Sequence, residues 1–148
     1  MEKITVGIKL VGEDARIPVY KTRRSSGADV VSIDDNYTLM PGESRMFHTG
    51  VYLQIPDGYE VQVRARSGLS AKYGVTVLNG VGTIDSDYQG ECNVILVNHG
   101  AEPFVVVKGE RIAQFVLAPV VQAVFQGIID FNEETERGAG GFGSTGMK

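Results

Sequence analysis

Hydrophobic and polar residues alternate with a period of two along two segments of this chain, residues 4–10 and 59–66. In each segment, apolar side chains take every second position, which is the pattern of a strand with one buried face. Two further runs, residues 104–107 and 112–117, are almost continuously apolar, as is typical of more deeply buried strands. The dominant prediction is therefore a set of short β-strands.

Turn-forming residues separate these runs, and such punctuation favours turns between strands. Short strands with turns at this spacing predict an all-β fold of the sandwich, barrel or jelly-roll type. The only predicted helix covers residues 67–73, with Gly68 and Gly74 limiting its length. The turn signals are Pro41-Gly42, Pro56-Asp57-Gly58, Asn79-Gly80, Asn98-His99-Gly100 and Lys108-Gly109.

The C-terminal segment differs from the rest of the chain. Residues 137–146 read RGAGGFGSTG, a stretch too rich in glycine to hold one conformation by itself. A plain Gly/Ser segment would be a flexible linker. A linker needs neither an arginine and a phenylalanine nor two hydroxyl side chains. We therefore predict a folded β domain over residues 1–136 and a glycine-rich arm over residues 137–148.

Length and charge narrow the function classes. The 148 residues suit one domain, with 43% hydrophobic and 22% charged residues. The formal net charge of −4 argues against non-specific electrostatic binding to nucleic acid. We see neither a signal peptide pattern nor an apolar run that could cross a membrane, and we predict a cytoplasmic protein. The single cysteine, Cys92, lies in the apolar run 92–97 and is predicted to be a core residue.

Two motifs could carry chemistry. In ARSGLS (residues 65–70) a strand ends in an arginine, and a Ser-Gly pair then opens the predicted helix. A guanidinium beside such amides suits phosphate oxygens, although a solvated arginine with a helix-capping serine is the simpler interpretation. In NGVGTIDSDYQGE (residues 79–91) two glycines let the backbone approach a ligand closely. Asp85 follows an apolar strand there, where partial burial could tune a general base; a solvated turn is the alternative.

Other candidates are weaker taken singly. GERIAQ (residues 109–114) could be a tight turn into a strand, and Asp29 a turn residue. His48 and His99 lack metal-ligand spacing to each other or to Cys92, so we interpret both as structural or surface residues.

Taken together and in order, SGADVVS (residues 26–32), ARSGLS, NGVGTIDSDYQGE, GERIAQ and RGAGGFGSTG resemble the five motifs of the trimeric dUTPase family. The resemblance spans residues 27–146, and the third and fifth motifs are the most specific. Departures are small: Ala65 stands where the family often has proline, Ser70 where it often has alanine, and Val30 where leucine is commoner.

The resemblance implies hydrolysis of dUTP to dUMP and pyrophosphate, with Asp85 activating the water that attacks the α-phosphorus. Tyr88 would lie under the deoxyribose and exclude a 2′-hydroxyl, and Phe142 would stack on uracil. Magnesium would be held mainly by phosphate oxygens and water, with Asp29 reaching it through a water. The implied uracil contacts are Asn79, Gly82, Thr83 and Ile84, and the implied phosphate contacts are Arg66, Ser67, Gly68, Gln114, Arg137, Ser144 and Thr145. Gly143 is a further implied substrate contact.

The same resemblance implies a jelly roll that forms a homotrimer, in which each active site draws residues from three chains. Two alternatives remain. A dCTP deaminase of the same fold would need a glutamate base where this chain has Ile95. A protein-binding regulator built on this fold, without activity or in addition to it, is the alternative from another class; five intact motifs argue against a loss of activity.

Overall fold

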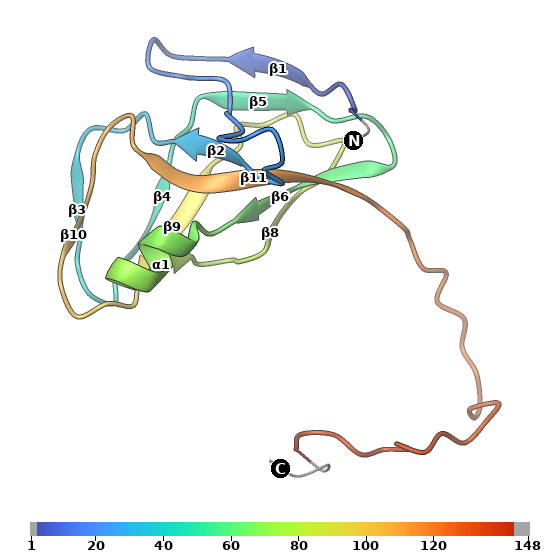
Figure 1. Ribbon diagram of the computed structural model, residues 1–148. Helices are drawn as coiled ribbons and strands as arrows, with labels where there is room; N and C mark the ends of the chain where they lie inside the picture. The colour runs from blue at the N-terminus through green and yellow to red at the C-terminus, as the bar shows by residue number, and fades with distance from the viewer. Residues whose placement is uncertain (1–2, 144–148) are drawn as a thin grey trace.

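A computed structural model of the protein describes residues 3–143, and it confirms the all-β prediction (Figure 1). One short helix interrupts a succession of strands. The elements are β1 (Gly7–Leu10), β2 (Ala28–Val31), β3 (Tyr37–Leu39), β4 (Ser44–Phe47), β5 (Val51–Gln54), β6 (Tyr59–Arg64), α1 (Ser67–Tyr73), β7 (Val75–Val77), β8 (Gly82–Ile84), β9 (Val94–Asn98), β10 (Phe104–Val106) and β11 (Arg111–Pro119).

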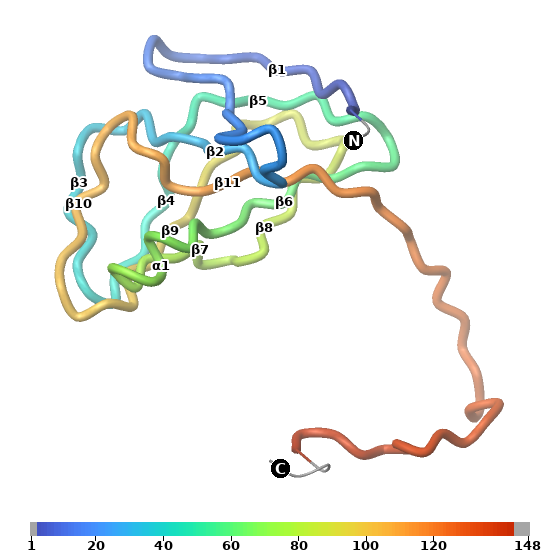
Figure 2. Tube along the Cα trace, in the orientation of Figure 1, coloured from blue at the N-terminus to red at the C-terminus, as the bar shows by residue number. Residues whose placement is uncertain are grey.

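Two sheets supply most of the core. A four-stranded sheet has the order β2-β11-β6-β8, and a three-stranded sheet has the order β4-β9-β7. The pairs β1-β5 and β3-β10 form two smaller sheets, and β3 and β10 run side by side in Figure 2. Val63 on β6, Phe115 on β11 and Leu96 on β9 belong to one buried cluster. Burial of this apolar surface is the main favourable contribution to folding.

The period-two pattern predicts β6 correctly but overstates burial near the N-terminus. Val61 and Val63 are buried, as the alternation requires. Within residues 4–10 only Gly7–Leu10 forms a strand, and Ile8 and Leu10 are 37% and 39% exposed. The physical reason is that β1 pairs only with β5, so the single chain places no second layer over these side chains.

The predicted helix is confirmed over Ser67–Tyr73. It ends at Gly74, whose φ of 68° is left-handed and whose N–H donates to the Ser70 carbonyl; glycine adopts this conformation at little cost. Arg66 is the N-cap residue and its side chain makes no capping hydrogen bond. The alternative interpretation of Ser67 as a capping serine is therefore not supported.

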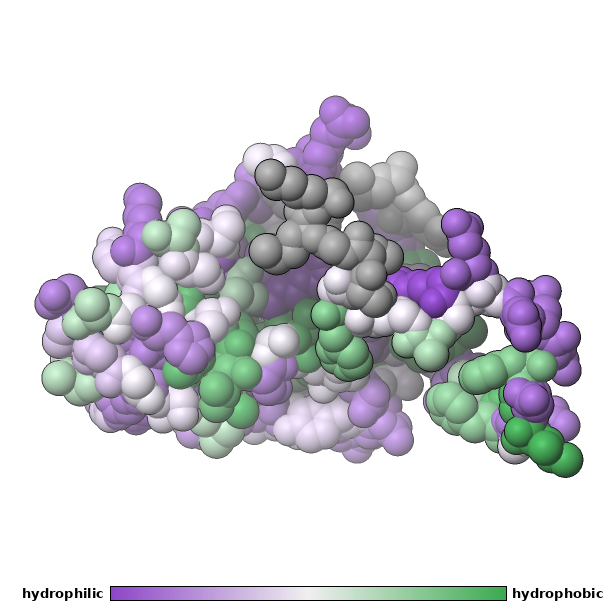
Figure 3. All heavy atoms as spheres, turned by 90° about the horizontal axis from the view of Figure 1, so that it is seen from below, coloured by the Kyte–Doolittle hydropathy of each residue, from purple (hydrophilic) through white to green (hydrophobic). Residues whose placement is uncertain are grey.

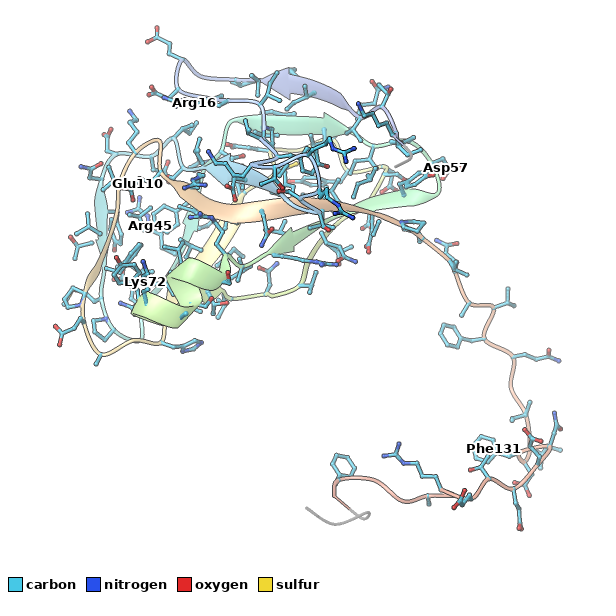
Figure 4. All side chains as sticks on the ribbon, in the orientation of Figure 1. Arg16, Arg45, Asp57, Lys72, Glu110 and Phe131 are labelled. Carbon is cyan, nitrogen blue, oxygen red and sulfur yellow. The ribbon has the colours of Figure 1, made fainter. Side chains whose placement is uncertain are left out.

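After Pro119 the chain leaves the sheets and runs away from the body (Figures 1 and 2). Val121 and Phe125 on this segment are each 95% exposed. Figure 4 places Phe131 far from the strands, and Figure 3 shows apolar side chains on the part that projects from the body. Within residues 3–143, no helix has the length and apolar character needed to cross a bilayer.

Candidate active site

A pocket of about 230 Å³ lies beside β8 and the turn that follows it. Apart from Phe142, it gathers the residues that the family resemblance assigned to uracil or deoxyribose contacts, together with Asp85. From the sequence-predicted set these are Asn79, Gly82, Thr83, Ile84, Asp85 and Tyr88; the other lining residues are Met46, Val63, Glu91, Cys92, Asn93 and Ile95.

Close packing explains the glycine at the start of β8. Gly82 is registered with Val63 on β6. A Cβ at Gly82 would lie 3.0 Å from the Val63 Cβ and 3.2 Å from the Asn79 Nδ2, tighter than ordinary van der Waals contact. Glycine thus lets the Asn79 amide fold against β8 at the edge of the pocket.

The Tyr88 ring has a defined place in the turn after β8. Its N–H donates to the Asp85 carbonyl at 3.1 Å, and its hydroxyl donates to the Glu91 carbonyl at 3.0 Å. The ring covers Gly90 so closely that a Cβ there would clash with it. Tyr88 remains 46% exposed, so it forms an aromatic wall with an open side.

Asp85 directly follows the buried Ile84 at the end of β8. Its own side chain is exposed in the single chain. The partial burial expected for Asp85 is therefore not found in the single chain, because the turn carries this residue out of the core. What the geometry provides is an accessible carboxylate on the rim of a pocket that also holds Tyr88.

Six lining residues were missed by the sequence analysis as pocket residues, and Glu91, Cys92 and Asn93 are three of them. Glu91 is held by backbone and imidazole contacts, and the Asn93 Oδ1 is buried without a hydrogen-bond partner among the described residues. Cys92 is a core residue, as predicted: burial raises the pKa of its thiol to about 11, which leaves it protonated and a poor nucleophile at neutral pH. Glu91 ends the NGVGTIDSDYQGE motif, but the local sequence does not indicate its contacts with His48 and Gly50, and Asn93 lies outside the motif.

The phosphate-binding candidates meet at one end of the four-stranded sheet. On β11, Gln114 is registered with Asp29 on β2 and with Arg64 on β6. The Asp29 carboxylate accepts hydrogen bonds from Arg66 Nε at 3.2 Å and from Arg111 Nη1 at 2.8 Å. Two guanidinium groups are thus gathered around one carboxylate of which only 12% of the side chain is exposed.

Arg66 and Gln114 are further oriented by the backbone. Arg66 Nη1 donates to the Arg111 carbonyl at 3.0 Å, and Gln114 Nε2 donates to the Ala65 carbonyl at 2.9 Å. A Cβ on Gly27 would clash with the Gln114 amide, so glycine is needed there. Ser67 and Gly68 follow Arg66 directly, as the first residues of α1, and complete this cluster.

None of the phosphate-binding candidates Arg66, Ser67, Gly68 and Gln114 lines the β8 pocket. A second pocket of about 250 Å³, lined by Asp29 and Arg111 among others, shares no lining residue with the β8 pocket. The arm lies apart from both: Arg137 Nε donates to the Gly140 carbonyl, and the fully exposed Phe142 precedes Gly143. Ser144 and Thr145 lie outside the described residues.

Residues 3–143 contain no group of three or more His, Cys, Asp or Glu side chains placed to hold a metal ion. Neither His48 nor His99 belongs to such a group among these residues. His48 instead contacts Glu91, with 2.9 Å between Nδ1 and Oε2.

Comparisons with known proteins agree with this geometry. A family model described as dUTPase matches residues 13–146. The deoxyuridine 5′-triphosphate nucleotidohydrolase of Nautilia profundicola is 55% identical over 141 residues, covering 94% of this chain and 96% of that protein. The protein of the same name from Methylocella silvestris is 52% identical over 150 residues, covering 98% and 93%.

Among solved structures, the Staphylococcus bacteriophage 80alpha dUTPase with dUPNHPP superposes with a TM-score of 0.88 at 27% identity. The match covers 97% of this chain and 99% of that one. Sequence motifs, strand arrangement and full-length similarity agree, and the chain belongs to the dUTPase family.

Proposed function

We propose that this protein hydrolyses dUTP to dUMP and pyrophosphate, which keeps uracil out of DNA and supplies dUMP for dTMP synthesis. The observation that carries the proposal is the pocket in which Asn79, the β8 backbone, Asp85 and Tyr88 come together. Two relatives named above as nucleotidohydrolases of deoxyuridine 5′-triphosphate support it.

Base recognition follows from the position of β8. It is the last strand in the order β2-β11-β6-β8, so only one of its edges is hydrogen-bonded within the sheet. A free strand edge offers backbone N–H and C=O groups to an added partner. Uracil presents a matching row of acceptors and a donor, and we place it along Gly82–Ile84 with Asn79 beside it. The Tyr88 wall would then face the deoxyribose.

For the chemical step, Asp85 accepts a proton from a water that attacks the α-phosphorus as pyrophosphate leaves. Catalysis of phosphoryl transfer rests mainly on positioning and charge stabilisation. Arg66, Ser67, Gly68 and Gln114 bind the phosphate oxygens. The guanidinium is suited to this role because Asp29 holds it by Nε, and it retains other N–H donors for a ligand.

Magnesium fits as a cation carried by the triphosphate, whose oxygens and water are ligands that it prefers. Asp29 can contribute through a water. Each of its carboxylate oxygens accepts one guanidinium N–H at present, and a carboxylate oxygen can accept a second hydrogen bond.

We further propose a homotrimer whose sites are shared between subunits, with residues 137–148 as the arm that closes over a neighbouring site. Two features of the single chain support this assembly. The phosphate-binding candidates Arg66, Ser67, Gly68 and Gln114 do not line the β8 pocket, although one nucleoside triphosphate must contact both. The apolar side chains of Val121, Val124 and Phe125 are each 95% exposed, and such surface normally packs against a partner. The arm of a neighbouring subunit would supply substrate contacts from Arg137, Phe142, Gly143, Ser144 and Thr145.

The direct test is pyrophosphate release from dUTP, with dCTP and UTP as controls. We expect turnover of dUTP in the presence of magnesium and little release from either control. Ammonia release from dCTP would instead indicate a deaminase, and no reaction with any of the three nucleotides would contradict the proposed function.

Tyr88 determines the expected preference for deoxyribose. Replacing Tyr88 with alanine opens the wall, and we expect the ratio of kcat/KM for UTP to that for dUTP to rise by about tenfold, because steric discrimination is lost. Tyr59→Ala is a suitable control, since Tyr59 lies at the far end of β6 and does not line the pocket. An unchanged ratio in Tyr88→Ala would remove this residue from sugar selection.

A further inference from the structure

The turn that carries Asp85 and Tyr88 is attached to the body of the protein at Glu91. The Glu91 Oε1 accepts hydrogen bonds from the N–H of Gly50 at 2.7 Å and of Thr49 at 3.1 Å. Its Oε2 contacts His48 Nδ1 at 2.9 Å. One carboxylate thus joins the end of the catalytic turn to the segment between β4 and β5.

Backbone contacts continue this attachment on the β9 side. The Cys92 N–H donates to the Val51 carbonyl, and the Thr49 hydroxyl donates to the Cys92 carbonyl, both at 2.8 Å. On the other side, the Tyr88 hydroxyl donates to the Glu91 backbone carbonyl. Glu91 is therefore the residue through which the Tyr88 wall is connected to the anchored part of the chain.

We propose that Glu91 is a positioning residue for sugar selection: its carboxylate, held by His48, Thr49 and Gly50, fixes the Glu91 carbonyl and through it the Tyr88 ring. Release of the carboxylate lets the ring move and makes room for a 2′-hydroxyl. This inference rests on the proposed function, because it assigns the β8 pocket to a deoxyribonucleotide.

The charge state of His48 gives the attachment a pH dependence. The hydrogen bond to Glu91 raises the pKa of His48 above its ordinary 6.5, with Asp34 contributing and with burial and Arg45 opposing. Burial works to raise the pKa of Glu91, but contacts with His48, Gly50 and Thr49 outweigh it and hold that pKa below 4.5.

Asp34, Arg45 and Glu91 are thus the charged groups that act on His48, and Tyr52 lines the same cavity. Asp34 also accepts the His48 backbone N–H at 3.1 Å. Because the pKa of His48 is raised on folding, its ion pair with Glu91 contributes fully below pH 6.5 and is lost as pH rises through the higher folded value. Because the pKa of Glu91 is lowered, its contribution is present above pH 4.5 and is lost in more acidic solution.

The first measurement does not depend on activity. Backbone amide hydrogen exchange of residues 85–92 is compared between the wild-type protein, Glu91→Ala and Glu43→Ala. Glu43 is the matched control: it accepts hydrogen bonds from the Tyr37 hydroxyl and the Met40 N–H, and it does not line the β8 pocket. We expect faster exchange at residues 85–92 in Glu91→Ala only. Unchanged exchange there would overturn the proposal.

The second measurement is the ratio of kcat/KM for UTP to that for dUTP. The ratio cancels ionisations that both substrates share, such as that of Asp85. We expect it to rise about threefold in Glu91→Ala, the scale of a partly exposed ion pair and its hydrogen bonds, and to stay at the wild-type value in Glu43→Ala. The conservative Glu91→Gln, which keeps the acceptor for Gly50, should lie between them.

The pH series separates positioning from a general loss of stability. In the wild-type protein the UTP:dUTP ratio should rise between pH 6.5 and 8.5, whereas in His48→Gln it should be raised already at pH 6.5 and remain flat. A ratio that is independent of pH in the wild-type protein, or the same slope in His48→Gln, would overturn the role of the pair. A wild-type chain that does not hydrolyse dUTP contradicts the proposed function instead, and hydrogen exchange then still decides whether Glu91 anchors the turn.

Discussion

Replacing Asp85 with asparagine is expected to lower the rate of dUTP hydrolysis by about a hundredfold or more, the scale of a general-base contribution. The amide keeps the shape of the carboxylate but cannot take a proton from water. Asp85 lies on the exposed rim of the β8 pocket, so the substitution leaves the core and the uracil contacts intact. Binding of the nucleotide should therefore largely survive.

Asp87→Asn is the matched control for this experiment. Asp87 is an exposed carboxylate in the same turn, two residues away, and it does not line the pocket. Steady-state kinetics would give kcat for both variants, and calorimetry with the analogue dUPNHPP would give their affinities. Turnover of Asp85→Asn near the wild-type rate would show that another group is the base.

Removing the arm is the second change with a large expected effect. A chain that ends before Arg137 should keep its fold, because residues 137–143 contribute nothing to the buried core. Its activity should fall by about a hundredfold or more, since the outer phosphates lose a positioned cation and the base loses its aromatic cover. Thermal unfolding would check the fold, and full activity in the truncated chain would identify the arm as a simple linker.

Mixing subunits tests whether the arm and Asp85 act in different chains. One protein carries Asp85→Ala and the other ends before Arg137, so each is nearly inactive alone. In a closed ring of three, every chain gives its aspartate to one site and its arm to another. Unfolding and refolding an equal mixture should restore about a quarter of the wild-type activity, because about three quarters of random trimers are mixed and each has one complete site.

Native mass spectrometry of the refolded mixture provides the control. Mixed trimers that recover no activity would show that the aspartate and the arm of one site come from the same chain. A protein that is monomeric at assay concentrations would contradict the shared-site proposal more directly.

Local patterns explain why much of the fold could be predicted. The helix was predicted over residues 67–73 with Gly68 and Gly74 limiting it; Gly74 does end the helix in the left-handed conformation, whereas Gly68 lies within its first turn. Alternation gave β6 because a strand in a one-sided layer must place Val61 and Val63 inward. Both features depend on neighbours within a few residues, which is the range that a sequence pattern can encode.

Features that depend on distant partners were not accessible. His48 was interpreted as a structural or surface residue, and its contact with Glu91 joins residues 43 positions apart. Nothing in either local sequence indicates the other. For Ile8 and Leu10 the sequence predicted burial, but both side chains are exposed in the single chain. An alternating pattern predicts that a strand has a buried face, but it does not say which surface covers that face.

The residues of the candidate site likewise fall into those that local motifs predicted and those whose contacts depend on distant strands. Ordered motifs were enough to select six residues of the β8 pocket, because these six lie within residues 79–88. They did not reveal that Asp29 is shared by Arg66 and Arg111, because this contact forms only when β2 and β11 pair. Cross-strand register, rather than composition, gathers these charges.

Under the proposed trimer, the exposed segment after Pro119 would make the stability of this protein depend on its concentration. Val121, Val124 and Phe125 gain nothing from burial while a chain is alone, and under the proposed assembly they are covered only after another chain is met. The free energy of unfolding then includes a contribution from association of the chains, so it decreases when the protein is diluted. In newly made chains, correct assembly would compete with non-specific aggregation through the same apolar side chains.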